Sequence, residues 1–332
     1  MSDANHDFRR IAVDLFEKGR IDVLVGFEKG NDGYRSRPAF VKSAEQAQKL
    51  TWDSTCSQNL AVYLPGIFRS DGKVAQAQKP PRAAFVTKAC DLRSIIALVK
   101  EKQAPRESLT LIGMPCRGMI DARKAAGAAG ADILRLEDQN DRVEMTLADG
   151  RTVSMDRETI VQDACRDCCF PSAEGADITV EGACRSPAAS EDSAVREFEK
   201  LPVEERWKKF STEMSRCIRC YACRQACPTC YCTECFAETN SPAWVGVTTE
   251  LTDTMIFHLI RVFHQAGRCV ECDACVRACP EGIDLRPFTK KIAADVRAMF
   301  GFTPGFDVET PPPLVTFAED DGQDFISEPR KG

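Results

Sequence analysis

The sequence predicts an α/β or α+β domain with a mixed sheet, followed by a mainly helical, cysteine-rich domain. Three observations support this fold class. The chain has 332 residues, 43% of them hydrophobic, which is enough for two domains with a sizeable core. Short apolar runs alternate with helical segments before residue 200, and two similar clusters of cysteines dominate the sequence after it. We therefore expect domains over residues 1–190 and 205–297, with an extended acidic tail over 298–332.

The first half reads as strands alternating with helices. Strands are predicted at residues 83–87, 109–116 and 131–137, and helices at residues 88–102 and 117–130. Asp149-Gly150 is a two-residue turn signal, so residues 142–155 are expected to form a hairpin. This alternation predicts helices that cover a mixed sheet. The GAAG segment at 127–130 reads as a helix end, and no G-x-G-x-x-G follows a strand.

In the second half, one amphipathic helix is predicted between the cysteine clusters, ending near Gly267. Its apolar positions are Leu251, Met255, Ile256, Leu259, Ile260 and Phe263. His258 and His264 lie on this helix and are expected to be surface or helix-packing residues. Residues 185–205 are polar, contain two prolines and are interpreted as the linker between the domains. The tail from Thr310 is proline-rich and acidic, so it is not expected to fold alone.

Charge and composition exclude several classes of protein. A net charge of −6 without a basic stripe gives no electrostatic basis for binding nucleic acid. No run of about 18 apolar residues occurs, so no membrane span is expected. The polar start MSDANHDFRR is unlike a signal peptide, which predicts a cytoplasmic protein. The 18 cysteines should then stay reduced and bind metal, while three histidines are too few for sites built mainly from imidazole.

The cysteines are concentrated in two runs with the same spacing. Residues 217–228 and 269–280 both read C-x2-C-x2-C-x3-C-P, the bacterial signature of a pair of 4Fe–4S clusters. Three thiolates come from one tight loop, whereas the fourth Cys opens a helix that carries it to the other cluster. The proline after it suits the first helical turn. The predicted ligands are Cys217, Cys220, Cys223 and Cys279 for the first cluster, and Cys269, Cys272, Cys275 and Cys227 for the second.

A zinc ribbon is the competing interpretation of these runs, because it also uses C-x2-C pairs. It needs only two thiols per knuckle and has no use for the third Cys or the proline. Three further thiols follow the first run: Cys230, Cys232 and Cys235. They could supply part of another cluster, substitute for a ligand or bind nothing, since free Cys also packs as a small apolar residue. Their density beside a cluster loop favours ligation.

The segment HLIRVFHQAGRCVECDACVRACPEGIDL, residues 258–285, resembles the helical ferredoxin domains of multi-subunit redox enzymes. A second resemblance lies in the first half. TKACDLRSI (87–95), IGMPC (112–116) and ACRDCCFPSAEGADITV (164–180) are similar, in their order and spacing, to segments of the beta subunits of coenzyme F420 hydrogenases and dehydrogenases. This second resemblance implies one FAD and one further 4Fe–4S cluster, and a role inside a larger redox complex.

The second resemblance assigns Cys116, Cys165 and Cys168 to the third cluster. Its fourth ligand has to be chosen among Cys56, Cys90, Cys169 and Cys184. Cys56 is favoured because WDSTCSQNL reads as a polar loop, whereas Cys90 could equally be a buried structural thiol. The adjacent Cys168 and Cys169 leave the ligand choice open by one residue.

The candidates for binding the FAD lie beside the predicted strand ends, where ligands gather in open α/β sheets. They are Lys88, Arg93, Gly113 and Arg117. The basic side chains among them could meet phosphates or a flavin edge. The alternative is that these charges simply belong to the protein surface.

The predicted function is therefore electron transfer in a multi-subunit, anaerobic-type redox complex. Electrons would pass between a flavin in the first domain and a partner subunit of the hydrogenase, formate dehydrogenase or heterodisulfide-reductase type. No acid–base or nucleophilic constellation is visible, so no catalytic residue is assigned. Two alternatives remain: a flavin-free wiring subunit, and a free-standing flavin oxidoreductase that reduces a small substrate such as sulfite.

Overall fold

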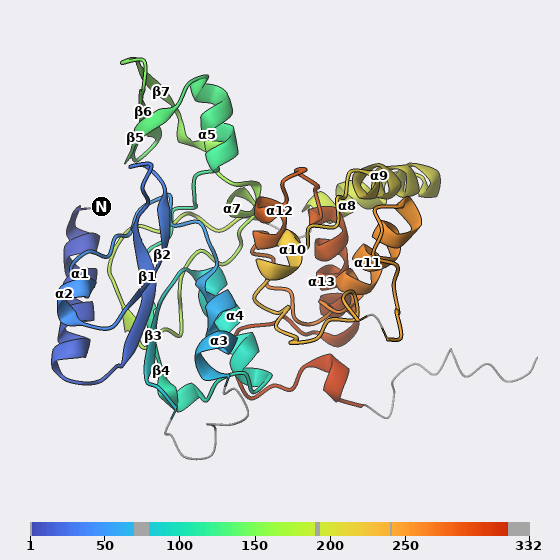
Figure 1. Ribbon diagram of the computed structural model, residues 1–332, viewed down its shortest axis with the longest axis horizontal. Coiled ribbons are helices and arrows are strands. Elements are labelled where there is room, and N and C mark those ends of the chain that lie inside the picture. The colour runs from blue at the N-terminus through green and yellow to red at the C-terminus, as the bar shows by residue number, and fades with distance from the viewer. Residues whose placement is uncertain (1, 70–79, 190–192, 240, 318–332) are drawn as a thin grey trace, which may run out of the picture.

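The computed structural model describes residues 2–69, 80–189, 193–239 and 241–317. Both sheets lie within residues 2–189, here called the first half of the chain, and the second half, residues 193–317, is helical (Figure 1). This arrangement confirms the predicted fold class. Two short helices of the second half, α10 and α12, lie nearest to the sheet-containing half (Figure 1).

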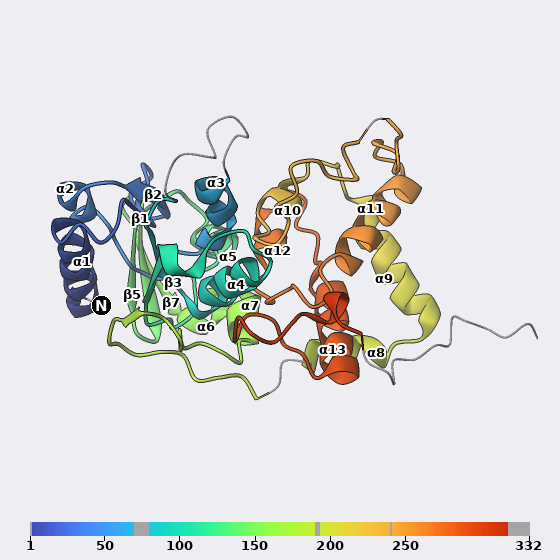
Figure 2. The ribbon, with the colours of Figure 1, turned by 90° about the horizontal axis from the view of Figure 1, so that it is seen from below.

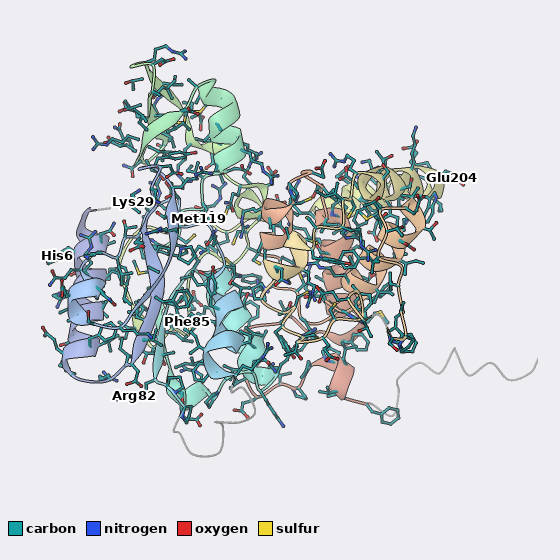
Figure 3. The ribbon with its side chains drawn as sticks, in the orientation of Figure 1. His6, Lys29, Arg82, Phe85, Met119 and Glu204 are labelled. Carbon is teal, nitrogen blue, oxygen red and sulfur yellow. The ribbon has the colours of Figure 1, made fainter. Side chains whose placement is uncertain are left out.

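The main sheet has five strands in the order β2-β1-β3-β4-β8. They are β1 (Val23–Lys29), β2 (Ser36–Val41), β3 (Ala83–Thr87), β4 (Leu109–Gly113) and β8 (Ile178–Thr179). Only the β1–β2 pair is antiparallel, so the sheet is mixed. All five residues of β3 are buried, which explains its uninterrupted apolar sequence. Phe85 lies on this central strand, in the main core (Figure 3).

Helices cover both faces of this sheet (Figures 1 and 2). One face carries α1 (Ser2–Glu17) and α2 (Ala44–Ala47), and the other carries α3 (Leu64–Phe68) and α4 (Ala89–Lys100). Short 3-10 turns occur at Leu60–Tyr63, Arg106–Ser108 and Pro313–Val315. Strand 83–87 and the helix after it are confirmed. The strand predicted at 109–116 is shorter and ends at Gly113, so Cys116 lies in the loop that follows it.

A second, three-stranded antiparallel sheet extends from the first. It contains β5 (Ile133–Gln139), β6 (Arg142–Leu147) and β7 (Thr152–Asp156), which includes the predicted hairpin. Gly150 has a φ of 84° in its turn, a conformation that glycine adopts without strain. The preceding α5 (Ala122–Ala129) is shorter than predicted, because the Asp121 side chain caps its first turn. Two single-turn helices follow, α6 (Arg157–Ile160) and α7 (Asp163–Arg166).

The second half consists of six helices within the described residues. They are α8 (Ser193–Glu199), α9 (Val203–Ser215), α10 (Ala222–Gln225), α11 (Leu251–Phe263), α12 (Ala274–Ala278) and α13 (Arg286–Phe300). Helix α11 is the predicted amphipathic helix, but its orientation is unexpected. Leu251, Ile256, Leu259 and Phe263 are exposed. The buried face instead carries Thr254, Phe257, His258, Arg261 and Val262.

The linker and the tail both contain ordered contacts. Helix α8 lies within the predicted linker, and its Phe198 packs edge-on against Phe288 of α13, with ring centroids 5.7 Å apart. The chain after α13 returns to the first half, where the Pro304 carbonyl accepts hydrogen bonds from Arg93. Residues 190–192 of the linker and 318–332 of the tail lie outside the described residues. Among the helices that are described, none has the length and apolar character needed to cross a membrane.

Candidate iron–sulfur and cofactor sites

The two cysteine loops share an unusual backbone conformation. Arg219 and Tyr221 have φ values of 55° and 59°, and Glu271 and Asp273 have φ values of 60° and 52°. These pairs occupy equivalent positions when the two runs are aligned on their cysteines. The left-handed region is costly for a residue with a side chain, so its use at the same places indicates that both loops follow one backbone path.

The first loop forms a pocket with the end of the second run. The thiols of Cys217, Cys220 and Cys223 line this pocket, and Cys279 completes it from the other run. Phe257 of α11 forms part of its apolar wall. The structure thus brings together the four thiols predicted for the first cluster, including the one that crosses between the runs.

The second loop forms a corresponding pocket. It is lined by Cys227, Cys269, Cys272 and Cys275, the four thiols predicted for the second cluster. Ser94 of α4 also lines it, so this site borders the sheet-containing half. No group of three His, Cys, Asp or Glu side chains in the described residues is close enough to hold a single metal ion. A single zinc ion binds each sulfur at about 2.3 Å from the metal. The sulfurs around one ion are therefore closer to one another than the four thiolates around a cubane core.

Helix α11 presents a buried polar side chain to the first site. Nε2 of His258 lies 3.3 Å from Sγ of Cys217, and His258 is only 2% exposed. Burial, and then the charges of Arg261 and Arg219, lowers the pKa of His258 to about 3. The imidazole is therefore neutral, and with its proton on Nε2 it can donate to a ligating thiolate. Of the two roles expected for these histidines, a surface position fits His264, which is exposed, whereas His258 is buried on the inner face of α11.

The three additional thiols differ in their surroundings. Sγ of Cys230 accepts a hydrogen bond from Nε2 of Gln265 at 3.4 Å and lies beside Cys227. Cys232 is exposed, and Cys235 packs against the core of the helical half. None of them lines either pocket. Their predicted role as ligands stays a prediction, for which Cys230 is best placed.

A third group of thiols meets where β3 and β4 end. Cys90 follows β3, Cys116 follows β4, and Cys165 and Cys168 come from α7 and the turn after it. All four line one cavity of about 70 Å³, together with Cys169 and with Cys272 of the second loop. Burial raises the pKa of Cys116 to about 12. The structure therefore gathers the three predicted ligands and offers two further thiols from the same half of the chain.

Cys56, the favoured fourth ligand, does not belong to this group. It is fully buried in the main core and does not line the cavity. Its Sγ lies 3.8 Å from the Thr51 carbonyl oxygen and 3.4 Å from the Asp53 backbone nitrogen. Burial, then the charge of Asp53, raises its pKa to about 12. Asp53 closes a tight turn here, since its side chain accepts from the Thr55 backbone and its carbonyl from the Cys56 backbone, and the polar composition of the loop did not reveal that Cys56 is buried. Cys184 is exposed and lies outside the cavity as well.

The predicted flavin residues do not converge on one cavity. Lys88 and Arg93 line the small cysteine cavity. Lys88 is buried, forms an ion pair with Asp91 at 2.8 Å and donates to the carbonyls of Cys56 and Gln58. The Arg93 guanidinium stacks against the rings of Phe170 and Phe306, each 4.8 Å away. The polar groups of these two side chains are therefore engaged in contacts within the protein.

Gly113 and Arg117 also have other roles. A Cβ atom at Gly113 would lie 2.9 Å from Cβ of Ala176 and 3.0 Å from Cβ of Ala173, so glycine permits close packing at the end of β4. Arg117 donates to the side chain and carbonyl of Asn140 on the β5–β6 turn. The alternative of surface charge is also wrong for Lys88 and Arg93, which are buried.

A much larger cavity, of about 720 Å³, lies between the two halves of the chain. Tyr34 and Tyr63 supply aromatic side chains, and Arg35, Arg123 and Arg277 supply positive charge. Its wall also includes residues of α10 and α12, next to the cysteine loops. Sequence reasoning missed this cavity because its lining comes from segments far apart in the chain, none of which forms a motif.

Comparison with known proteins yields matches in both halves. A 4Fe-4S dicluster domain model matches residues 213–283. The chain is 24% identical over 358 residues to the F420-dependent formate dehydrogenase subunit beta of Methanocaldococcus jannaschii, covering 90% of this chain and 91% of that protein. It is also 24% identical over 364 residues to the F420-dependent formate dehydrogenase 1 subunit beta of Methanococcus maripaludis, covering 90% of each.

A chain from the F420-reducing NiFe hydrogenase complex of Methanosarcina barkeri aligns over 51% of this chain and 60% of its own length, with 13% identity and a TM-score of 0.40. The two formate dehydrogenase subunits align along nearly the whole chain, and the dicluster match falls on the paired cysteine runs. Over nearly its whole length, the chain is therefore similar to beta subunits of F420-dependent formate dehydrogenases.

Proposed function

We propose that this chain is an iron–sulfur electron-transfer subunit with three 4Fe–4S clusters and one FAD. The observation that carries the proposal is the convergence of thirteen cysteines on three pockets, four in each of two pockets and five more, beside the shared Cys272, in the third. Two relatives are named as beta subunits of F420-dependent formate dehydrogenases. By analogy, the partner is another subunit of a formate dehydrogenase or hydrogenase complex.

We assign the third cluster to Cys116, Cys165, Cys168 and Cys90. Cys169 is the other thiol from the first half that lines the cavity, but its Sγ lies 3.3 Å from the Ala188 carbonyl oxygen. Cys90 and Cys116 instead follow two paired strands, β3 and β4, and both line the cavity. Burial, then the charge of Asp91, raises the pKa of Cys90 well above its ordinary value. Iron would stabilise the thiolate form of Cys90, which burial disfavours.

We place the FAD in the cavity between the two halves. Its volume lies within the range of about 300–1,000 Å³ that is typical of sites for small molecules and cofactors. Tyr34 and Tyr63 could contact a flavin ring, and Arg35, Arg123 and Arg277 could bind its phosphates. When bound, the flavin supplies hydride and single-electron chemistry.

The positions of the pockets suggest an order of electron transfer. Arg277 lines both the large cavity and the third cluster cavity, and it donates to the Cys272 carbonyl at 2.6 Å. Cys272 lines the cavities of the third and second clusters. Cys227 of the first run lines the second pocket, and Cys279 of the second run lines the first, so these two cluster sites are neighbours. The inferred order is flavin, third, second and first cluster.

The first cluster site is the one from which we expect electrons to leave. Cys220 is exposed, and Ile218 beside it is 51% exposed. The apolar residues on the outer face of α11, Ile256, Leu259 and Phe263, are exposed in the same half. Apolar side chains gathered on a surface are typical of subunit interfaces, so this face suits a partner subunit of the redox complex.

Chemical analysis of anaerobically purified protein tests the proposal. The chain should contain about twelve iron and twelve acid-labile sulfide atoms, four of each per cubane, and about one FAD. Stoichiometric zinc without sulfide would overturn the account of the clusters. A full complement of iron without flavin would leave the flavin-free wiring subunit. Turnover of a small substrate such as sulfite by the isolated chain with a reduced dye would favour the free-standing oxidoreductase.

A further inference from the structure

Arg261 is a buried cation on the inner face of α11. It is 3% exposed, and its Nη2 donates to the carbonyl of Cys223 in the first cysteine loop at 2.9 Å. His258, one turn earlier on the same face, contacts the thiol of Cys217. Gln265, in the turn after the end of α11, donates to the thiol of Cys230. The inner face of α11 and this turn therefore present three polar side chains to the cysteine loops, and Arg261 is the central and charged one.

Two of the three guanidinium nitrogens of Arg261 have no partner among the described residues. Its Nε and Nη1 atoms are buried without a hydrogen-bond partner there, whereas Nη2 donates to the Cys223 carbonyl. Burying an unpaired charge is strongly unfavourable. A protein retains such a group where a negative charge becomes available nearby.

Arg261 lies between side chains that contact ligands of the two clusters. Nε2 of His258 lies 3.3 Å from Sγ of Cys217, and Oε1 of Gln265 lies 3.7 Å from Sγ of Cys227. Cys217 and Cys223 are proposed ligands of the first cluster, and Cys227 is a proposed ligand of the second. A 4Fe–4S core with four thiolates carries net negative charge, which increases on reduction. The anionic clusters would therefore supply the negative charge that the buried guanidinium of Arg261 lacks.

We propose that Arg261 is the shared counter-cation of the first and second clusters and raises the reduction potential of both. The inference rests on the proposed function, because it requires both clusters. Each reduction adds one electron to a cluster, and Arg261 keeps its proton throughout because its side chain does not deprotonate in proteins. A fixed positive charge stabilises the added electron, and net charge and hydrogen bonding are what set the potential of such clusters.

The test is redox titration of Arg261→Gln and Arg261→Lys, with each cluster followed by electron paramagnetic resonance. In Arg261→Gln, we expect the equilibrium constant for one-electron reduction to fall at least tenfold at both clusters, equivalent to 59 mV. Arg261→Lys keeps the charge and should shift both clusters much less. His258→Leu should shift the first cluster alone, because His258 contacts Cys217 only. Lys208→Gln removes one exposed charge from α9 in the same half and should shift neither.

Iron and sulfide analysis of each variant separates failure of this inference from failure of the proposed function. Wild-type protein without iron–sulfur clusters would overturn the proposed function itself. Loaded Arg261→Gln protein with unchanged potentials, or with one potential changed, would overturn the shared role. If Arg261→Gln binds neither cluster while Arg261→Lys binds both, the charge is required at this point and the inference stands. Loss of both clusters from both variants would show that the guanidinium shape matters instead, and would overturn it.

Discussion

Arg268 and Glu101 form a two-pronged ion pair, although 167 residues separate them in the sequence. Nη2 of Arg268 lies 2.7 Å from Oε2 of Glu101, and Nε lies 2.5 Å from Oε1. Arg268 directly precedes Cys269, and Glu101 follows the last residue of α4. The pair therefore fastens the second cysteine loop to the helix that begins beside Cys90.

We expect Glu101→Gln to destabilise the protein by about 1–3 kcal/mol. The two side chains are only 19% and 17% exposed, so the change leaves a largely desolvated guanidinium without its carboxylate. Denaturant unfolding of the anaerobic, cluster-loaded protein measures the effect. Glu197→Gln is the matched control, because its ion pair with Lys200 is about 70% exposed and should contribute under about 1 kcal/mol. Equal effects of the two changes would contradict the argument.

The crossing of ligands between the runs can be tested with four serine variants. Cys220→Ser and Cys279→Ser should perturb the same redox signal, because both thiols line the first pocket. Cys227→Ser should instead behave like Cys272→Ser, because both line the second. Electron paramagnetic resonance of the reduced variants distinguishes the two patterns. If Cys227→Ser matches Cys220→Ser, each run closes its own cluster. If Cys227→Ser has no effect, Cys230 beside it has taken its place.

The fourth ligand of the third cluster can be identified from iron content. Cys90→Ala should lower the iron content from about twelve to about eight per chain, since one cubane holds four irons. Cys56→Ala should keep about twelve, because Cys56 lies in the core outside the cysteine cavity. Retention of iron in Cys90→Ala with loss in Cys169→Ala would give the role to Cys169. Loss of four irons from Cys56→Ala alone would restore the original assignment to Cys56.

Filling the large cavity should remove the flavin without removing the clusters. Ala122 lines this cavity at the start of α5. Ala122→Trp should reduce the FAD released from the purified protein to a small fraction and leave the iron content unchanged. Ala126 lies on the same helix, is exposed and does not line the cavity. The Ala126→Trp variant should therefore retain FAD. Full flavin content in Ala122→Trp would show that the flavin binds elsewhere.

The parts of the site that the sequence predicts are those built from local spacing. The two cysteine runs encode their loops directly, and Cys90 and Cys116 could be placed at strand ends because β3 and β4 are continuous apolar runs. The location of Cys56 could not be predicted, since its burial depends on how the loop around Asp53 packs. Strands β1 and β2 and helix α1 were not identified either.

The orientation of α11 is the most informative discrepancy. Its apolar positions predict a helix correctly, and ordinary reasoning would bury them. Phe263 is instead 61% exposed, whereas His258 and Arg261 are buried. A helix next to charged cofactors can turn a polar face inward, because the cofactors supply partners that the sequence alone does not display. The apolar face is then left exposed, where the proposed partner subunit could bind.

The two cysteine loops have left-handed residues at the same positions, so the two cluster sites have equivalent backbones. Arg219 and Tyr221 in one loop, and Glu271 and Asp273 in the other, give the backbone the same course around each cluster. Backbone amides should therefore favour the two clusters equally. Any difference between their potentials must come from side chains that break the equivalence, such as His258, which has a thiol to contact in the first site. The direction of electron transfer between the two clusters would therefore be set by a few side chains around two sites with the same backbone course.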